Sequence, residues 1–296
     1  MVNKPNFFIV GAPKCGTTAM NDYLAQHPDI FMAKKEIHYF GSDLKTRLKI
    51  SESEYLQYFR EAGNKKIIGE ASVWYLYSKT APVEIKKFSP GAKILIMLRN
   101  PVYVLHSLHS QHLFDGNENI TDFEEALDLD AERKRGNRVP DSLDFFELPS
   151  YRDSVLFAEQ VRRYLDTFGS ENIHVVLYED FVADTERAVS ETLNFLGLDR
   201  KIKMTYNVIN PNKKIRFFSL HRLLKNPSPG LKKLTRIILP FKKLRHRIMV
   251  YLFKWNIRIK ARDKISDQLY ARLKASFSDD INSLGKMIHK DLSSWL

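Results

Sequence analysis

The sequence has little cysteine and no long hydrophobic run. Its 296 residues include one cysteine, Cys15, which excludes an intramolecular disulfide and any cysteine-based zinc or iron–sulfur site. No stretch approaches the roughly 20 uncharged apolar residues that a membrane-spanning helix needs. The apolar run from Phe7 to Val10 is also too short for the core of a signal peptide. We therefore expect a soluble, cytoplasmic protein.

Acidic residues are scarce in one part of the chain. Between Lys213 and Lys264 there are 17 lysines and arginines against one acid, Asp263, whereas the rest of the chain holds 30 basic and 34 acidic residues. Such a segment attracts polyanions, and we expect an anionic membrane surface, at the inner membrane face, or an acidic polysaccharide as its partner. We expect no nucleic acid partner. The alternative is a helical surface whose charges are simply solvated.

Short apolar segments alternate with helical segments along the first two thirds of the chain. Residues 6–10, 67–69, 93–98 and 172–177 are the expected strands. The expected helices are residues 17–26, 151–168 and 185–196, with one more that begins at Asn100-Pro101. Because the strands have apolar residues on both faces, the pattern predicts a three-layer α/β fold with a central parallel sheet flanked by helices.

The change in charge suggests a division at residue 212. We expect residues 1–212 to form the α/β core, and residues 213–296 to form a basic helical C-terminal region packed on the same domain or completing it. Residues 136–150 lack periodicity and are expected to be a long surface loop. Residues 231–255 have a basic amphipathic pattern that Pro240 interrupts.

One loop has the composition of an anion-binding site. It has the sequence Gly-Ala-Pro-Lys-Cys-Gly-Thr-Thr, from Gly11 to Thr18, and lies between an expected strand and an expected helix. Backbone N–H groups and the positive end of the helix converge there with Lys14 and two hydroxyls, which suits a phosphate or sulfate ester. An ordinary strand-to-helix turn would not need a lysine together with two threonines.

The loop departs from the one that binds nucleoside triphosphates. That motif places its lysine directly before the first serine or threonine, whereas here Gly16 precedes Thr17. The strand at residues 93–98 is also followed by Arg99 and not by a magnesium-binding carboxylate. A phosphotransferase that uses magnesium and ATP is therefore the weaker alternative.

These motifs resemble those of sulfotransferases that use 3′-phosphoadenosine 5′-phosphosulfate. The Gly11–Thr18 loop is similar to the family's 5′-phosphosulfate loop, and Leu98-Arg99-Asn100-Pro101 followed by Ser107 is similar to its 3′-phosphate motif. Residues 35–40, Lys-Glu-Ile-His-Tyr-Phe, resemble a stretch of the heparan sulfate type of glycan sulfotransferase. Residues 178–181, 195–198 and 291–295 match later landmarks, the last of them typical of bacterial members. The resemblance implies a P-loop-like fold.

The resemblance also implies roles for the donor site. The donor would be 3′-phosphoadenosine 5′-phosphosulfate, with no metal required because the donor already carries the activated group. Lys14 would stabilise the leaving group. The N–H groups of Cys15, Gly16, Thr17 and Thr18 would bind the phosphosulfate, and Arg99 and Ser107 would bind the 3′-phosphate. The acceptor would be a hydroxyl or amine of a carbohydrate or similar small molecule.

The same resemblance makes Glu36 the general base, with His38 beside it, and Glu70 is a second candidate for the base. The family's usual second arginine, five residues after the first, is Val104 in this chain. Part of the 3′-phosphate clamp is therefore missing, and a later basic residue could compensate: Lys213, Lys214 or Arg216.

Other residues leave alternatives open. A catalytically inactive sulfotransferase-like protein that binds membranes or polyanions is a rival to the enzyme. The three histidines at positions 106, 109 and 112 could hold a cation, but we favour a polar face that lines the acceptor cleft. Trp74, Tyr75 and Tyr77 either bind adenine or belong to the core. Cys15 could have thiolate character at a helix start, but we expect it to fill the loop.

Overall fold

The computed structural model describes residues 3–34, 36–138, 150–199, 202–207, 213–225, 227–238, 240–259 and 262–296. The chain forms two compact units. The sheet unit comprises Met1–Leu105, Tyr151–Ile209 and Tyr270–Leu296, and the helical unit comprises His106–Ser150 and Asn210–Leu269. Residues 213–296 are thus shared between both units, and the division at residue 212 stays a prediction.

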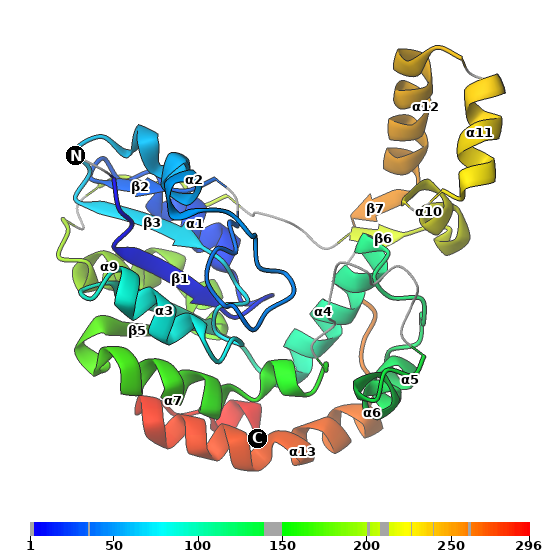
Figure 1. Cartoon of the computed structure of the whole chain (residues 1–296). Coiled ribbons are helices and arrows are strands. Elements are labelled where there is room, and N and C mark those ends of the chain that lie inside the picture. The colour runs from blue at the N-terminus through cyan, green and yellow to red at the C-terminus, as the bar shows by residue number, and fades with distance from the viewer. Residues whose placement is uncertain are drawn as a thin grey trace. The chain divides into compact units, whose positions relative to one another are not determined.

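The sheet unit is built on five parallel strands in the order β2-β3-β1-β4-β5 (Figure 1). Their bounds are β1 Phe7–Gly11, β2 Ile30–Met32, β3 Ile67–Ala71, β4 Lys93–Leu98 and β5 Ile173–Leu177. Every residue of β1 and β3 is buried, which is why these strands have apolar residues on both faces. The predicted α/β fold with a central parallel sheet is confirmed.

Helices cover the sheet in two layers. α1 (Thr17–Leu24) packs with α9 (Thr185–Phe195), and α3 (Ala81–Phe88) packs with α7 (Phe157–Phe168). In the strand order, the connection from β1 to β2 runs toward the β2 edge of the sheet, whereas the connection from β3 to β4 runs toward the β5 edge. Because crossovers between parallel strands are right-handed, α1 and α3 therefore belong to opposite faces. The short elements of this unit are α2 Glu52–Leu56, η1 Gln57–Ala62, η3 Asp153–Val155, η4 Ser170–Asn172, α8 Tyr178–Ala183 and η5 Ser293–Trp295.

The start of α7 differs from the helix expected at residues 151–168. The helix begins only at Phe157, after the turn η3. Asp280 of α13 (Asp267–Ile288) accepts hydrogen bonds from the N–H groups of Phe157 and Ala158, at 2.9 Å and 3.2 Å. A carboxylate from a distant helix therefore caps α7, and local sequence does not contain this signal. Figure 1 shows α13 running alongside α7.

The helical unit combines short helices with a two-stranded antiparallel sheet. The helices are α5 Phe123–Asp128, α6 Asp130–Lys134, α10 Phe218–Lys225, α11 Pro229–Ile238 and α12 Lys242–Trp255, and the strands are β6 Lys213–Ile215 and β7 Ile257–Ile259. Most of α4 (Pro101–Asp115) also belongs here. Arg133 binds the buried carboxylate of Glu118 through two hydrogen bonds, of 2.6 Å and 2.8 Å.

Two predictions about this region have different outcomes. α11 and α12 flank Pro240, as the interrupted amphipathic pattern predicts. The long loop expected at residues 136–150 lies mostly outside the described residues, which resume at Ser150. Within the described part of the chain, no helix is both long and apolar enough to cross a bilayer.

The topology brings the predicted site residues of the sheet unit to one edge of the sheet. Parallel strands end at the same edge, and such folds bind ligands there. The Gly11–Thr18 loop follows β1, Arg99 follows β4, and Glu70 is the penultimate residue of β3. β1 pairs with both β3 and β4, so the three groups come from adjacent strands.

Candidate active site

The loop after β1 has a backbone that only small residues fit at two points. A Cβ atom on Gly11 would lie 2.7 Å from the Val73 carbonyl oxygen and 2.7 Å from the Leu76 Cβ atom. Gly16 is the N-cap of α1 and has a φ of 89°, in the left-handed region that favours glycine. Lys14 also has a positive φ, 66°, which is uncommon for a residue with a side chain. The loop is therefore held in a strained shape of the kind found at ligand-binding sites.

The start of α1 supplies N–H groups without a capping side chain. Gly16 provides no side-chain hydrogen bond to the first turn of the helix. Thr17 is buried, whereas Thr18 is exposed. An uncapped helix start with a neighbouring lysine is suited to an anion.

Cys15 lies inside this loop and is fully buried. Its thiol donates a hydrogen bond to the Pro13 carbonyl oxygen at 3.4 Å. Burial raises the pKa of the Cys15 thiol well above its usual range, although the Arg99 charge acts in the opposite direction. Cys15 therefore stays a neutral thiol that fills the loop, and it is no nucleophile.

Arg99 lies beside the loop and is held by aromatic rings. The Ala12 N–H donates a hydrogen bond to the Met97 carbonyl oxygen at 2.7 Å, which joins the start of the loop to the end of β4. The Arg99 guanidinium carbon lies 4.3 Å from the ring centre of Tyr178 and 5.7 Å from that of Tyr103. Among the described residues, no carboxylate forms an ion pair with Arg99. Stacking thus orients the guanidinium while its charge remains available to an anion.

The helix after Arg99 begins as the sequence predicts. The Asn100 side-chain oxygen accepts a hydrogen bond from the Val102 N–H at 3.0 Å, and Pro101 is the first residue of α4. Val104 is completely buried, so an arginine there would have to bury its charge in the core. The second arginine of the 3′-phosphate motif is therefore absent from this position of α4.

The other residues predicted for the 3′-phosphate belong to the helical unit. Ser107 is buried in α4, and its role in binding the donor stays a prediction. Lys213 and Lys214 are residues of β6. The Arg216 guanidinium lies 5.5 Å from the ring centre of Trp255. That one of these three replaces the missing arginine also stays a prediction.

Glu36 and His38 form a close pair in the segment that follows β2. The Glu36 Oε2 atom lies 2.9 Å from the His38 Nε2 atom. The Glu36 side chain is 41% exposed, so a substrate can reach it, whereas that of His38 is 19% exposed. His38 has a φ of 52°, again in the left-handed region. The pair has the arrangement of a carboxylate base oriented by a neighbouring imidazole.

Glu70 lies beneath this segment and is completely buried. The hydroxyls of Tyr55 and Tyr75 donate hydrogen bonds to its Oε1 atom, at 2.6 Å and 3.2 Å. The Ser72 hydroxyl donates to its Oε2 atom at 2.9 Å. Burial raises the pKa of the Glu70 carboxyl, although the three hydroxyls oppose this shift. Burial also raises the pKa of both tyrosines, which therefore remain protonated donors.

Two of these hydroxyls also hold the backbone of the segment from Glu36 to Phe40. The Ser72 oxygen accepts hydrogen bonds from the N–H groups of Ile37 and His38, at 3.2 Å and 3.1 Å. The Tyr75 oxygen accepts from the next two N–H groups, at 2.8 Å and 3.2 Å. Four successive backbone groups are thus connected to Glu70 through two hydroxyls. This network fixes the turn that presents Glu36 and His38.

This network is the part of the site that the sequence analysis missed. The sequence motifs give Ser72 no role, and they suggest Tyr75 only for adenine binding or for the core. Tyr75 and Trp74 are buried core residues. The signal available in the sequence was a glutamate at the end of a buried strand, followed by hydroxyl residues two and five positions later.

The histidines of α4 have other partners. The His109 Nε2 atom lies 2.9 Å from the Ile120 carbonyl oxygen, and burial lowers the pKa of His109. The rings of His106 and His109 pack on Phe123, with ring centres 5.0 Å and 5.5 Å apart. Among the described residues, no three histidine, cysteine or acidic side chains gather closely enough to hold a metal ion.

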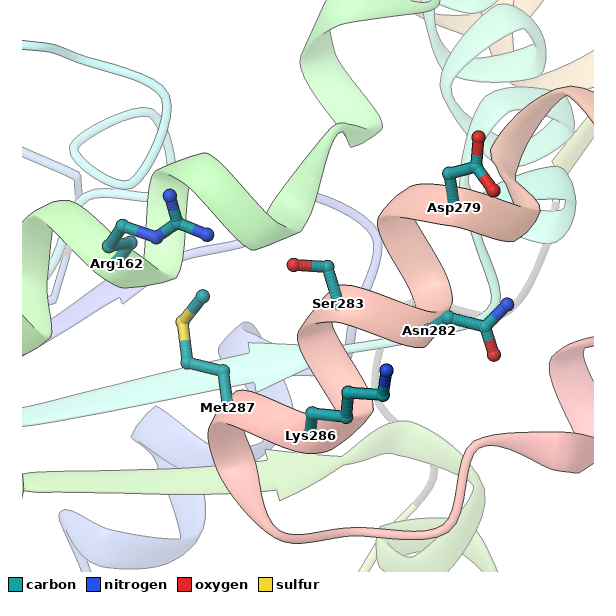
Figure 2. Close-up of a pocket in the computed structure, with 6 residues that line it drawn as sticks. All are labelled: Arg162, Asp279, Asn282, Ser283, Lys286 and Met287. Atoms are coloured by element: carbon teal, nitrogen blue, oxygen red, sulfur yellow. The ribbon is translucent and has the colours of Figure 1, made fainter.

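A surface pocket of about 670 Å³ lies elsewhere on the sheet unit, between α7 and α13. Figure 2 shows its lining side chains, with Arg162 on α7 and the other five on α13. None of the residues predicted for the donor or the acceptor lines this pocket. It is therefore separate from the candidate active site.

Comparison with known proteins agrees with this geometry. The family described as "Sulfotransferase domain" matches residues 4–214. A sulfotransferase of known structure from Alicyclobacillus acidocaldarius has 29% sequence identity and a TM-score of 0.72, over 99% of this chain and 98% of that one. The P-loop-like fold expected from the resemblance is thereby confirmed.

Curated relatives match over part of their own length. Carbohydrate sulfotransferase 15 of Mus musculus is 27% identical over 66% of this chain and 44% of the relative. Heparan sulfate glucosamine 3-O-sulfotransferase 5 of Homo sapiens is 28% identical over 67% of this chain and 52% of the relative. Membrane-associated sulfotransferase kil1 of Dictyostelium discoideum is 24% identical over 66% and 56%. The chain therefore spans about half the length of the curated relatives it matches.

The family match extends over more than half of the chain, and it contains both the Gly11–Thr18 loop and Arg99. The resemblance inferred from the sequence motifs is confirmed, and the chain belongs to the sulfotransferase domain family.

Proposed function

We propose that this protein transfers the sulfuryl group of 3′-phosphoadenosine 5′-phosphosulfate to a hydroxyl, or an amine, of a carbohydrate acceptor. The observation that carries the proposal is the placement of the Gly11–Thr18 loop and Arg99 at the ends of adjacent strands. In this proposal the loop binds the 5′-phosphosulfate of the donor, and Arg99 binds its 3′-phosphate. The carbohydrate class of acceptor is inferred from relatives named for carbohydrate and heparan sulfate sulfotransfer.

The residues of the loop fit such a donor. The close approach at Gly11 and the left-handed conformation at Lys14 shape the backbone into a cradle, and the uncapped start of α1 adds N–H donors. Arg99 offers a planar fork that matches a phosphate. The donor supplies an already activated sulfuryl group, so the proposed step requires no metal.

Transfer is an in-line displacement. The acceptor oxygen forms a bond to sulfur while the bond from sulfur to the 5′-phosphate oxygen breaks. In this proposal, Glu36 removes the proton of the acceptor hydroxyl, and His38 orients the carboxylate. Lys14 stabilises the negative charge that develops on the leaving phosphate. The N–H groups at the start of α1 stabilise the remaining oxygens, because preorganised donors need no rearrangement during the reaction.

Glu70 has a positioning role in this proposal and is not the base. It is completely buried, and hydroxyl donors occupy both of its oxygens. An acceptor therefore has no access to it. Its influence reaches the reaction through Ser72 and Tyr75, which hold the backbone of residues 37–40.

Two experiments separate the proposed function from its two rivals. Isothermal calorimetry compares adenosine 3′,5′-bisphosphate with ATP and magnesium. We expect tight binding of the bisphosphate alone, whereas a phosphotransferase would prefer ATP with magnesium. An acceptor screen with labelled donor, analysed by mass spectrometry, then distinguishes an active enzyme from an inactive relative. The cytoplasmic location stays a prediction.

Lys14→Ala should lower turnover by about 100-fold or more, because a preorganised positive charge at the leaving group is lost. The melting temperature should change little, since the Lys14 side chain is only half-buried. Steady-state kinetics and thermal unfolding measure both quantities. A variant with activity within a factor of about 3 of the parent would show that this loop is not catalytic.

Arg99→Ala should weaken binding of adenosine 3′,5′-bisphosphate by about 2–3 kcal/mol, since a charge-assisted contact is lost. Calorimetry with adenosine 5′-phosphosulfate is the control, because that ligand lacks the 3′-phosphate and should lose much less. Equal losses for both ligands would mean that Arg99 does not bind the 3′-phosphate.

Glu36→Gln should lower the rate at saturating acceptor by about 100-fold or more, as expected for removal of a general base. The affinity for the bisphosphate should stay unchanged, which calorimetry checks. If the glutamine variant keeps its full rate, Glu36 is not the base, and the role passes to His38.

Two variants test the positioning role of the Glu70 network. Tyr75→Phe removes the hydroxyl that holds the N–H groups of Tyr39 and Phe40, and should lower kcat by about tenfold while donor affinity is kept. Tyr164→Phe is the control, because that buried hydroxyl donates only to the Tyr75 carbonyl oxygen, at 2.9 Å. Tyr164→Phe should lose about 1 kcal/mol of stability, and Tyr75→Phe should lose more, since it leaves two N–H groups and one bond to Glu70 without a partner. Equal effects on kcat would show that Tyr75 acts only through the stability of the core.

A further inference from the structure

Exposed apolar side chains are concentrated in the helical unit. Three of the four most exposed large hydrophobic residues of the described chain are Ile237, Ile238 and Phe241, with exposures of 69%, 65% and 72%. They lie at the end of α11 and directly before α12, at the turn of a helical hairpin. Figure 1 shows this hairpin next to β6 and β7 of the same unit. Tyr251, on α12, is 68% exposed.

Basic residues flank these apolar residues in the sequence. Arg236 precedes them, Lys242 and Lys243 follow them, and all three are exposed. The sequence contains no aspartate or glutamate from residue 200 to residue 262. No acidic residue of this segment can therefore neutralise the positive charge, so the segment attracts partners with negative charge.

The presence of exposed apolar side chains beside basic ones indicates which polyanion is the partner. An acidic polysaccharide is bound by basic and polar groups and gives no reason to expose two isoleucines and a phenylalanine to water. A lipid bilayer with anionic headgroups offers both phosphates for the lysines and an apolar layer for the hydrophobic side chains. α11 has 10 residues and α12 has 14, so each is too short to span the roughly 30 Å hydrocarbon layer. Such a hairpin is suited to the surface of a membrane.

We propose that the α11–α12 hairpin docks this protein on an anionic lipid bilayer, with Ile237, Ile238 and Phe241 inserted among the headgroups and the flanking lysines on the phosphates. This interaction surface is independent of the sulfuryl transfer proposed above. It requires no activity and no acceptor.

Vesicle sedimentation tests the surface with the full-length chain. Phosphatidylcholine vesicles with phosphatidylglycerol should pellet the protein, and phosphatidylcholine alone should not. Ile237→Ser/Ile238→Ser/Phe241→Ser should weaken the binding by about tenfold or more, since the inserted apolar area is lost. The control is Val83→Ser/Val182→Ser, which changes exposed apolar residues of the sheet unit and should bind normally.

A second pair of variants tests the charges. Lys233→Glu/Lys242→Glu/Lys243→Glu should abolish pelleting, whereas Lys49→Glu/Arg60→Glu/Lys87→Glu, an equal charge change at exposed sites of the sheet unit, should retain most of it. Binding should also weaken strongly at about 1 M salt, where the screening length falls to ~3 Å. Circular dichroism verifies that every variant is folded.

A fluorescent probe reports insertion directly. Phe241→Trp should shift its emission to the blue with anionic vesicles and be quenched by brominated acyl chains, and Val182→Trp should do neither. Three results would overturn the proposal: no pelleting with anionic vesicles, equal losses for the test and control variants, or retention on a heparin column without vesicle binding. A concentration-dependent dimer that Ile237→Ser/Ile238→Ser/Phe241→Ser abolishes would instead identify a second copy of the chain as the partner.

Discussion

The carboxylate of Glu70 connects the sheet to the candidate catalytic residues. It is buried at the end of β3, where leaving a charged group without partners would be costly. Three hydroxyls satisfy it, and two of them pass the constraint on to four backbone N–H groups of the segment after β2. The segment that presents Glu36 has little regular structure of its own. Its shape is therefore set by a group in the core and not by its own sequence.

The fold was predictable because its signals are local. The strand Lys93–Leu98 agrees residue by residue with the prediction, and so does the start of α4 at Pro101, since each depends on apolar runs and capping residues close in sequence. The carboxylate cap of α7 was not predictable, because Asp280 lies more than 120 positions from the N–H groups that it binds. The same reason explains the missed strand β2, whose three residues are stabilised mainly by pairing with β3.

The candidate site also has a part that the sequence predicts and a part that it does not. The motifs pointed to Lys14, Glu36 and Arg99 because the chemistry of a family is carried by short stretches of sequence. Their supporting contacts were not visible: the rings of Tyr178 and Tyr103 at Arg99, and the hydroxyls of Ser72 and Tyr75 beneath His38. These contacts join residues from different strands and helices, so they exist only after the sheet has formed. The candidate reactive groups can therefore be read from the sequence. The contacts that position these groups can be read only from the folded structure.

Two strained residues of the site show how the sheet supports its chemistry. Lys14 and His38 both adopt the left-handed region, which costs each of them about 1–3 kcal/mol. At His38, the hydrogen bond from its N–H group to Ser72 offsets the cost, and the Glu70 network stabilises Ser72 in turn. At Lys14, the neighbouring link from Ala12 to Met97 ties the loop to β4. The strain at each residue is therefore balanced by bonds to a different neighbour of β1, β3 on one side and β4 on the other. Because both neighbours pair with the same central strand, a change in the register of β1 would disturb the Gly11–Thr18 loop and the Glu36 segment together.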